Sequence, residues 1–327
     1  MVKRERTTER RAWTYAPAPV PDLAAFRAGG AARRAFLRYW TLGIAKEGAD
    51  LALFFLMKLL PARLCSDLGA RLGAFAFPRW HKTAIARTRA NLARLMPDAT
   101  SSERDALMRR NWENQGRLMT EFSVVNRMAG DRRRVTVEGE RGIAEAVARG
   151  PLILMGVHTG NWELIWPVVS RLGIRAALNY APPKSPVRHW IARHVRRRAG
   201  IDLLPPGRAA VRPALKRLQA GGTVIIFCDE GLQGRIRGPF LGRPPHLEGN
   251  LALVARLARL TGAALCPIHV ERHGATRFHV RAGSPFHLPE TSDPESALLD
   301  DAVRLNTLIE PIVRAHLDQW YFLDSGL

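Results

Sequence analysis

Residues 152–163 read Leu152-Ile-Leu-Met-Gly-Val157 followed directly by His158-Thr-Gly-Asn-Trp-Glu163, and this junction decides the fold class. The first six residues are uncharged and mostly large and apolar, which is typical of a strand buried on both faces of a sheet. From Trp162 to Leu172 the apolar side chains recur with the spacing of a helix. A buried strand that leads through a short loop into a helix is the unit from which α/β folds are built.

Short apolar runs and helical stretches alternate throughout the chain after Asp131. Strands are predicted at Val135–Val137, Leu152–Val157, Ala176–Asn179, Thr223–Cys228, Leu265–Val270 and Phe278–Arg281. Helices are predicted at Ile143–Ala148, Trp162–Leu172, Val187–Ala199, Ala209–Gln219 and Asn250–Leu260. The alternation indicates an α/β fold class, in which a mixed, mostly parallel sheet is covered by helices.

The region before Asp131 carries helical patterns instead. Residues 1–34 are basic and include three closely spaced prolines, so we expect a flexible basic tail. From Phe36 to Leu60, apolar and charged side chains fall mostly on opposite sides, which predicts an amphipathic helix suited either to the membrane interface or to the domain core. We therefore divide the chain into the tail at 1–34, a helical membrane-associating region at 35–130 and an α/β domain at 131–327.

The composition adds a strong positive charge. Fifty Lys and Arg residues against 29 Asp and Glu give the 327-residue chain a formal charge of +21. Such an excess favours nucleic acid, an anionic membrane or an acidic protein as partner. A genome of high GC content, which favours arginine in all its proteins, would produce the same composition. Three widely spaced cysteines are typical of neither a disulfide framework nor a zinc site. No secretory signal is recognisable, and no uncharged run reaches the roughly 18–20 residues of a membrane span.

The loop after the first strand quoted above contains the candidate catalytic residues. In an open α/β sheet, ligands bind beyond the carboxyl ends of the strands, which is where His158 is expected. A neutral imidazole can accept the proton of an attacking hydroxyl, and Glu163 is a candidate to orient it. Gly160 permits close backbone approach, and Asn161 is a candidate donor to a developing oxyanion. A structural histidine that caps a helix is the alternative for His158.

Candidate substrate-binding residues lie in the same loop and near a second strand end. Trp162 and Gly160 belong to the loop itself. Asp229 and Glu230 follow the strand at Thr223–Cys228. Two functional roles are open for Asp229, orienting His158 or binding an acceptor through an arginine, and a solvated loop acid is the alternative. Arg198 ends a basic helical segment, and Arg237 belongs to a second basic group. Their guanidinium groups match phosphate geometry, while a solvated surface is the alternative for both.

The segment Gly156–Glu163 resembles the HxxxxE signature of the bacterial lipid A late acyltransferases, the lauroyl and myristoyl transferases. Further stretches resemble this family in the same order: Asn91–Pro97, Ser101–Arg104, Thr223–Asp229, Gly238–Pro244, Ala255–Pro267 and Asp318–Trp320. The resemblance extends from about Leu37 to the C-terminus and marks a divergent member. Gly231 stands where the family usually has a second acid, and its C-terminal HRR cluster is absent.

This resemblance implies an enzyme that transfers a fatty acyl group from acyl carrier protein to a hydroxyl of a lipid A precursor. It implies a peripheral or monotopic location on the cytoplasmic face of the bacterial inner membrane, with anionic lipids as further partners. No metal, bound cofactor or nucleic acid is expected. Because Phe227–Gly231 also resembles the FPEG motif of glycerolipid acyltransferases, another glycolipid or a glycerolipid stays open as acceptor.

Two other functions remain open at this stage. A non-catalytic binder of nucleic acid or membrane would explain the charge, but it leaves the strand–HTGNWE–helix junction without a purpose. A thioesterase would use the same site with water in place of the acceptor, although the chain lacks the GxSxG motif of many hydrolases.

Overall fold

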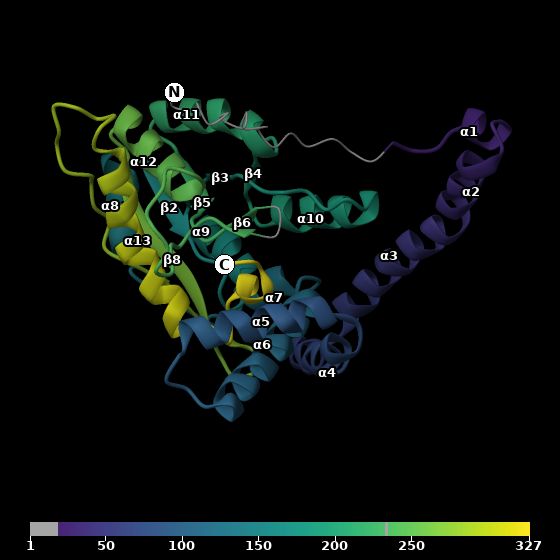
Figure 1. The fold of residues 1–327 in the computed structure, drawn as a ribbon. Helices are drawn as coiled ribbons and strands as arrows, with labels where there is room; N and C mark the ends of the chain where they lie inside the picture. Colours follow the sequence, from purple (N-terminus) through teal and green to yellow (C-terminus); the bar gives the residue numbers. More distant parts are fainter. Residues whose placement is uncertain (1–18, 233–234) are drawn as a thin grey trace, which may run out of the picture.

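The computed structural model describes residues 19–232 and 235–327, and it consists of an α/β body from which a helical arm projects (Figure 1). The arm comprises α1 (Leu23–Arg27), α2 (Gly30–Arg38), a π-helical turn at Tyr39–Gly43 and α3 (Ile44–Leu59). Three helices then pack beside the sheet: α4 (Ala62–Trp80), α5 (Lys82–Leu95) and α6 (Ser101–Glu121). The short α7 (Val125–Ala129) leads into the α/β part.

One seven-stranded sheet forms the centre of the body, with the order β1-β9-β8-β2-β5-β3-β4. Its strands are β1 (Val135–Glu138), β2 (Leu152–Gly156), β3 (Ala176–Leu178), β4 (Asp202–Leu203), β5 (Thr223–Phe227), β8 (Ala264–His273) and β9 (Arg277–Ala282). Every neighbouring pair is parallel except β8 and β9, so the predicted mixed, mostly parallel α/β sheet is confirmed. A hairpin of β6 (Gly231–Leu232) and β7 (Arg235–Ile236) stands apart from it.

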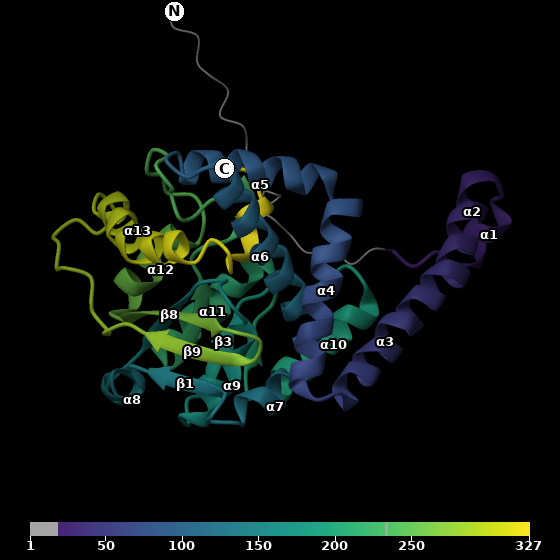
Figure 2. The ribbon, with the colours of Figure 1, turned by 90° about the horizontal axis from the view of Figure 1, so that it is seen from below.

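Helices cover both faces of the sheet, as Figure 2 shows from below. They are α8 (Glu140–Arg149), α9 (Ile165–Arg171), α10 (Pro186–Arg198), α11 (Val211–Gln219), α12 (Asn250–Thr261) and α13 (Leu298–Ala315). Three 3-10 turns lie at Trp162–Leu164, Gly207–Ala210 and Tyr321–Asp324. All six predicted strands and five predicted helices are present with ends shifted by a few residues, whereas α13, β4 and the β6–β7 hairpin were not predicted.

The central strand β2 explains why its sequence is continuously apolar. Leu152 and Leu154 belong to a core on one face of the sheet, and Ile153 and Met155 belong to a second core on the other. Successive side chains of a strand alternate between faces, so a strand covered on both sides needs apolar residues at every position. All five residues of β2 are fully buried. This double burial fixes the register of the strand and the position of the loop after it.

The N-terminal region differs in part from the prediction. Residues 1–18 of the expected tail lie outside the described residues, whereas α1 and the beginning of α2 make residues 23–27 and 30–34 helical rather than loosely ordered. The expected amphipathic helix is present as the π-helical turn and α3 with part of α2. Only Phe54 and Met57 of α3 are buried, so most of this helix is not packed on the core. The three-part division of the chain stays a prediction.

One ion pair and two further hydrogen bonds fix α3 to the start of α10. The Glu47 carboxylate accepts hydrogen bonds from Ser185 Oγ and from the Val187 N–H, at 2.7 and 2.8 Å. Arg188 forms a two-pronged ion pair with Asp50, at 2.7 and 2.9 Å. None of the helices in the described chain has both the length and the apolar character that crossing a membrane requires.

Candidate active site

His158 and Asp229 meet at the carboxyl ends of two adjacent parallel strands. Strands β2 and β5 pair in parallel with Gly156 opposite Phe227, so the residues that follow them emerge side by side. His158 Nδ1 lies 2.9 Å from Asp229 Oδ1, and the His158 backbone N–H donates to Asp229 Oδ2 at 2.7 Å. Of the two roles left open for Asp229, the structure therefore shows direct contact with His158.

The Asp229 carboxylate fixes which nitrogen of His158 carries the hydrogen. An ionised carboxylate can only accept, so Nδ1 is the donor, and the Nε2 lone pair is left to accept a proton. Asp229 is fully buried, and a third donor, the Trp320 indole N–H, reaches its Oδ2 at 2.9 Å. A buried carboxylate needs such partners because an unpaired charge in the interior is costly. The arrangement holds one imidazole in one orientation.

Aromatic rings enclose the imidazole on several sides. Phe227 stacks on His158 with ring centroids 3.8 Å apart, while Trp162 and Phe322 approach edge-on, each at 5.0 Å. The His158 side chain nevertheless keeps 17% of its surface exposed. The ring is therefore shielded but reachable from outside. Trp162, predicted to bind substrate, is a wall of this enclosure; contact with substrate stays a prediction.

The expectation that Glu163 orients His158 is wrong. Glu163 accepts a hydrogen bond from Trp166 Nε1 at 2.6 Å and forms a two-pronged ion pair with Arg196 of α10. It is 3% exposed, and its hydrogen-bond partners are Trp166 and Arg196 rather than the histidine. Closeness in sequence suggested the wrong carboxylate, because the adjacent strand β5 supplies the nearer one.

Asn161 is likewise not available as the expected oxyanion donor. Its side chain is fully buried, and Nδ2 donates to Glu121 Oε2 at 2.8 Å. Glu121 is itself paired with Arg272 through two contacts of 2.7 Å, and both side chains are almost completely buried. Asn161 therefore connects the loop to a buried ion pair between α6 and β8. That connection positions the loop rather than presenting an amide to a substrate.

Gly160 allows the backbone of the loop to approach β8 closely, whereas its expected contact with substrate stays a prediction. Its φ of +57° lies in the left-handed region, and a Cβ atom there would come within 2.5 Å of the Val270 carbonyl oxygen. Its neighbour Thr159 donates from Oγ1 to the same carbonyl at 3.0 Å. The loop after β2 thus lies directly against the end of β8. A side chain at Gly160 would displace the loop and, with it, His158.

Glu230 and Arg237 follow Asp229 in the chain. Glu230 Oε1 accepts the backbone N–H of Asn250 at 2.7 Å and so caps the N-terminus of α12. Burial, with a smaller contribution from Asp229, raises the pKa of Glu230 to about 8. Arg237 pairs with Glu248 at 2.6 Å. Both predicted substrate-binding residues therefore already have structural partners, and their substrate contact stays a prediction.

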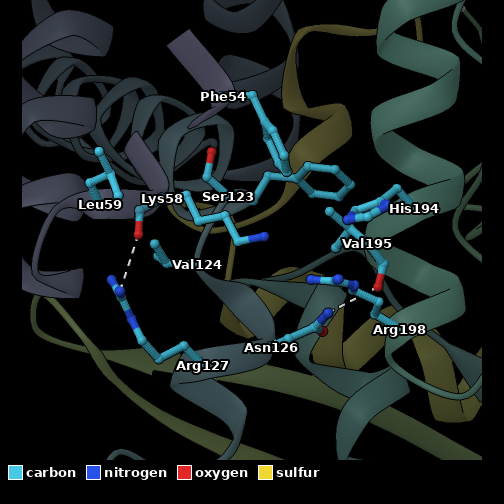
Figure 3. A pocket seen from close by; sticks show the side chains of 11 residues that line it. Phe54, Lys58, Leu59, Ser123, Val124, Asn126, Arg127, His194, Val195 and Arg198 are labelled. Atoms are coloured by element: carbon cyan, nitrogen blue, oxygen red, sulfur yellow. Dashed lines mark hydrogen bonds between the residues drawn. The ribbon is translucent and has the colours of Figure 1, made fainter. Parts of the chain in front are cut away.

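Arg198 is not part of the His158 site. It lines a cavity of about 570 Å³ between α3, α7 and α10, shown in Figure 3. No hydrogen bond or ring contact in the described residues joins His158 to the lining of this cavity. The predicted binding residues therefore fall into two separate places.

The C-terminal segment, whose contact with His158 was not predicted from the sequence, completes the site. The Tyr321 backbone N–H donates to the His158 carbonyl at 3.0 Å, which fixes the 3-10 turn beneath the histidine. Asparagine side chains of α5 and α6 hold this segment by binding its carbonyl groups: Asn91 binds Leu323 and Ser325, and Asn111 binds Leu317 and Trp320. Stretches far apart in sequence, at Asn91 and at Asp318–Trp320, thus act together.

Two groups of described side chains have metal-ligating atoms close together: His269–Glu271–His316 and Glu271–His273–His279. Glu271 is common to both groups. It accepts from His269 Nε2 at 3.2 Å and pairs with Arg281 at 3.2 Å, so its charge is already compensated by protein groups. We assign no metal to these groups.

Comparison with known proteins identifies the family of this chain. The family model described as bacterial lipid A biosynthesis acyltransferase matches residues 29–326. The chain belongs to this acyltransferase family. It is therefore an acyltransferase, as the resemblance implied, and its structural elements from α2 to the C-terminal turn all lie within the matched region.

No curated protein sequence matches the acyltransferase significantly. Among solved structures, it is similar to the 1-acyl-sn-glycerophosphate (LPA) acyltransferase PlsC from Thermotoga maritima. The two share 13% sequence identity, with 82% of this chain and 97% of that chain covered and a TM-score of 0.33.

Proposed function

We propose that the acyltransferase moves a fatty acyl group from acyl carrier protein to a hydroxyl of a lipid A precursor, with His158 as the general base. One observation supports the catalytic assignment above all: Asp229 binds His158 Nδ1 at 2.9 Å, which leaves Nε2 without this partner, and the histidine side chain keeps 17% of its surface exposed. In many transferases and hydrolases, a histidine base that is oriented by a carboxylate in this way activates a hydroxyl nucleophile.

Proton transfer in the proposed reaction uses this pair and the bound substrates. His158 Nε2 takes the proton of the acceptor hydroxyl while its oxygen attacks the thioester carbonyl carbon. The carbon–oxygen bond forms and the carbonyl electrons move to an oxyanion. On collapse, the carbon–sulfur bond breaks, and the leaving thiolate takes the proton from the imidazolium, which Asp229 stabilises throughout. Neutral His158 is restored, and no metal or bound cofactor takes part.

We assign stabilisation of the oxyanion to backbone N–H groups of the loop at 160–162. The Asn161 side chain, which the sequence suggested as the oxyanion donor, already donates to Glu121. Backbone donors held by a rigid loop are well suited to this task because they need no reorganisation as charge develops. The loop is held by Gly160 and Thr159 against β8 and by Asn161 against Glu121.

The proposed donor and acceptor follow from the family and the charge. The formal charge of +21 favours both acyl carrier protein, which is acidic, and anionic lipid. A glycerolipid or another glycolipid remains the alternative acceptor, because the chain departs from the family pattern at Gly231 and at its C-terminus.

The arm supports a location on a membrane surface, which we propose to be the cytoplasmic face of the bacterial inner membrane. Leu53 and Leu56 of α3 are 52% and 55% exposed, and four residues of α4 form an exposed apolar stripe: Leu64, Leu68, Leu72 and Phe75. Spacings of three and four residues place the α4 side chains on one side of the helix. An apolar surface of this extent is typical of an interfacial helix.

The test is lipid mass spectrometry of cells that lack the protein, complemented by wild type or by His158→Ala. Loss of one acyl chain from lipid A, restored by wild type alone, supports the proposal. A change confined to another lipid class would support the chemistry and overturn the acceptor. No lipid change, with the protein folded and expressed, would overturn the proposed function.

A reconstituted assay separates transfer from hydrolysis. Purified enzyme is given acyl carrier protein charged with a labelled acyl chain, with and without a lipid A precursor. Transfer predicts that label leaves the carrier only when the lipid is present. Release of free fatty acid at the same rate without lipid would identify a thioesterase instead. Replacing the carrier by acyl-coenzyme A tests the donor assignment.

A further inference from the structure

The cavity that contains Arg198 is lined by cationic side chains from two separate helices. Lys58 lies at the end of α3, and Arg198 lies at the end of α10. Figure 3 shows the Lys58 ammonium and the Arg198 guanidinium extending into the same space from opposite sides. In the part of the chain that the structure describes, neither side chain has a carboxylate within ion-pair distance. Two cations facing one cavity without a counter-ion favour an anionic ligand.

Two neighbouring groups strengthen this electrostatic argument. Burial and the charges of Arg198 and Lys58 lower the pKa of His194, which also lines the cavity. The histidine thus experiences the field of both cations. Arg127 holds the wall by donating to the carbonyl groups of Lys58 and Leu60, where α3 ends. The last carbonyl groups of a helix have no partner within the helix, and Arg127 supplies one for them here. The contact also fixes Lys58 at the edge of the cavity.

Asn126 holds another part of the cavity wall. Its Nδ2 donates to the Val195 carbonyl at 3.0 Å, which joins α7 to α10. Its Oδ1 is buried and has no hydrogen-bond partner among the described residues. The Nδ2 contact keeps the two helices that flank the cavity together.

The remaining walls are apolar and continue into the arm. Phe54, Leu59 and Val124 line the cavity, and the exposed Leu53 and Leu56 lie on the same helix, α3. A ligand whose charged group enters the cavity can therefore keep an apolar chain on the surface of α3. The volume of about 570 Å³ also suits a lipid headgroup, since ligand sites commonly measure about 300–1,000 Å³.

We infer that this cavity binds the phosphate of an anionic membrane lipid. Lys58 and Arg198 contact the phosphate together, because it presents more acceptor oxygens than a carboxylate does. The inference deepens the proposed function, on which it rests for the membrane location, by naming the headgroup chemistry that holds the enzyme at the bilayer.

The cavity is also linked to the catalytic loop through the chain. Phe122 of the lining follows Glu121, which binds Asn161, and Val195 precedes Arg196, which binds Glu163. The residues that support the loop after His158 are thus neighbours of the residues that form the cavity wall. A lipid held here lies beside the element that positions the base.

The test compares binding of the full-length enzyme to two kinds of phosphatidylcholine vesicle with equal negative charge. One contains phosphatidylglycerol, which offers a phosphate, and the other contains oleate, which offers a carboxylate. Lys58→Gln/Arg198→Gln is expected to lower the preference for phosphatidylglycerol by about tenfold, since a basic residue near an anionic surface contributes roughly fivefold in affinity.

The matched control is Lys46→Gln/Arg193→Gln, which removes the same charges from exposed positions of α3 and α10. It is expected to weaken binding to both vesicles equally and to keep the preference. If Lys58→Gln/Arg198→Gln prefers phosphatidylglycerol over oleate vesicles as strongly as this control does, the inference is overturned. A wild-type preference that millimolar inorganic phosphate abolishes would also overturn it, because the ligand would then be free phosphate.

Binding and turnover separate this inference from the proposed function. His158→Ala is expected to keep the vesicle preference while losing acyl transfer. If wild type shows the preference but no acyl transfer to any lipid, the proposed function fails and the inference stands. If wild type transfers the acyl group but shows no preference for phosphatidylglycerol, the inference fails and the proposed function stands.

Discussion

The indole N–H of Trp320 donates to Asp229 Oδ2 at 2.9 Å, across 91 residues of sequence. Asp229 in turn binds the imidazole of His158, so the C-terminal segment, the end of β5 and the end of β2 form one hydrogen-bonded chain. Each link is buried or nearly so, which makes the geometry of the base depend on contacts far from it in sequence. This dependence separates residues that act on His158 from those that only hold the fold.

Asp229→Asn is expected to lower kcat about 10³–10⁴-fold, because an amide in place of the carboxylate favours the wrong imidazole tautomer and cannot stabilise the imidazolium. Acyl transfer under saturating substrate measures this loss. The matched variant is Glu163→Gln, which removes a buried carboxylate that binds Arg196 instead of His158. It is expected to cost stability and to keep most of kcat. Equal losses of kcat in the two variants would contradict the assignment.

Trp320→Phe is expected to lower kcat about tenfold while leaving KM unchanged, since it removes one hydrogen bond to a buried carboxylate that orients the base. Trp166→Phe is the matched control, because Trp166 also donates to a buried carboxylate, that of Glu163, at 2.6 Å. Both variants are expected to lower the melting temperature to a similar degree. A similar fall of kcat in both would show that Trp320 acts only through stability.

These residues show which parts of the site can be predicted from the sequence and which cannot. The strand β2 and the position of His158 follow from local pattern, because double burial requires a continuous apolar run. The carboxylate partner does not, since it depends on β5 lying next to β2, and the sequence alone favoured Glu163 for its nearness. The two-residue strand β4 is too short to show a period, and so is the β6–β7 hairpin. The role of Trp320 depends on tertiary contacts alone.

Glu230 is expected to make stability depend on pH. Its folded pKa of about 8 lies above the usual value of 4.5, so between these values the folded protein holds a proton that the unfolded chain has released. The free energy of unfolding should therefore fall as pH rises through this interval and level off above it. Urea unfolding at a series of pH values measures the effect. Glu230→Gln is expected to flatten this slope, and an unchanged slope would contradict the assignment.

The exposed leucines of α3 are expected to drive membrane binding. Leu53→Gln/Leu56→Gln should lower partition into vesicles by roughly several hundredfold, because burying each leucine contributes about 1.5–2 kcal/mol. Leu260→Gln/Leu299→Gln is the control, since both leucines are exposed, at 68% and 41%, but lie on α12 and α13. Vesicle sedimentation gives the partition coefficients. Equal effects of the two pairs would show that α3 has no special part in binding.

Gly116 allows α4 and α6 to touch along their backbones. A Cβ atom at Gly116 would lie 2.0 Å from the carbonyl oxygen of Gly69, and one at Gly69 would meet Gly116 in return. Gly116→Ala is therefore expected to lower the free energy of unfolding by about 3 kcal/mol, because the contact leaves no room and the helices must separate. Gly48→Ala on α3 is the control, since a Cβ there meets nothing within 4 Å. Chemical denaturation should show a loss for Gly116→Ala and none for Gly48→Ala; equal stability of both variants would mean that the two helices can move apart without cost.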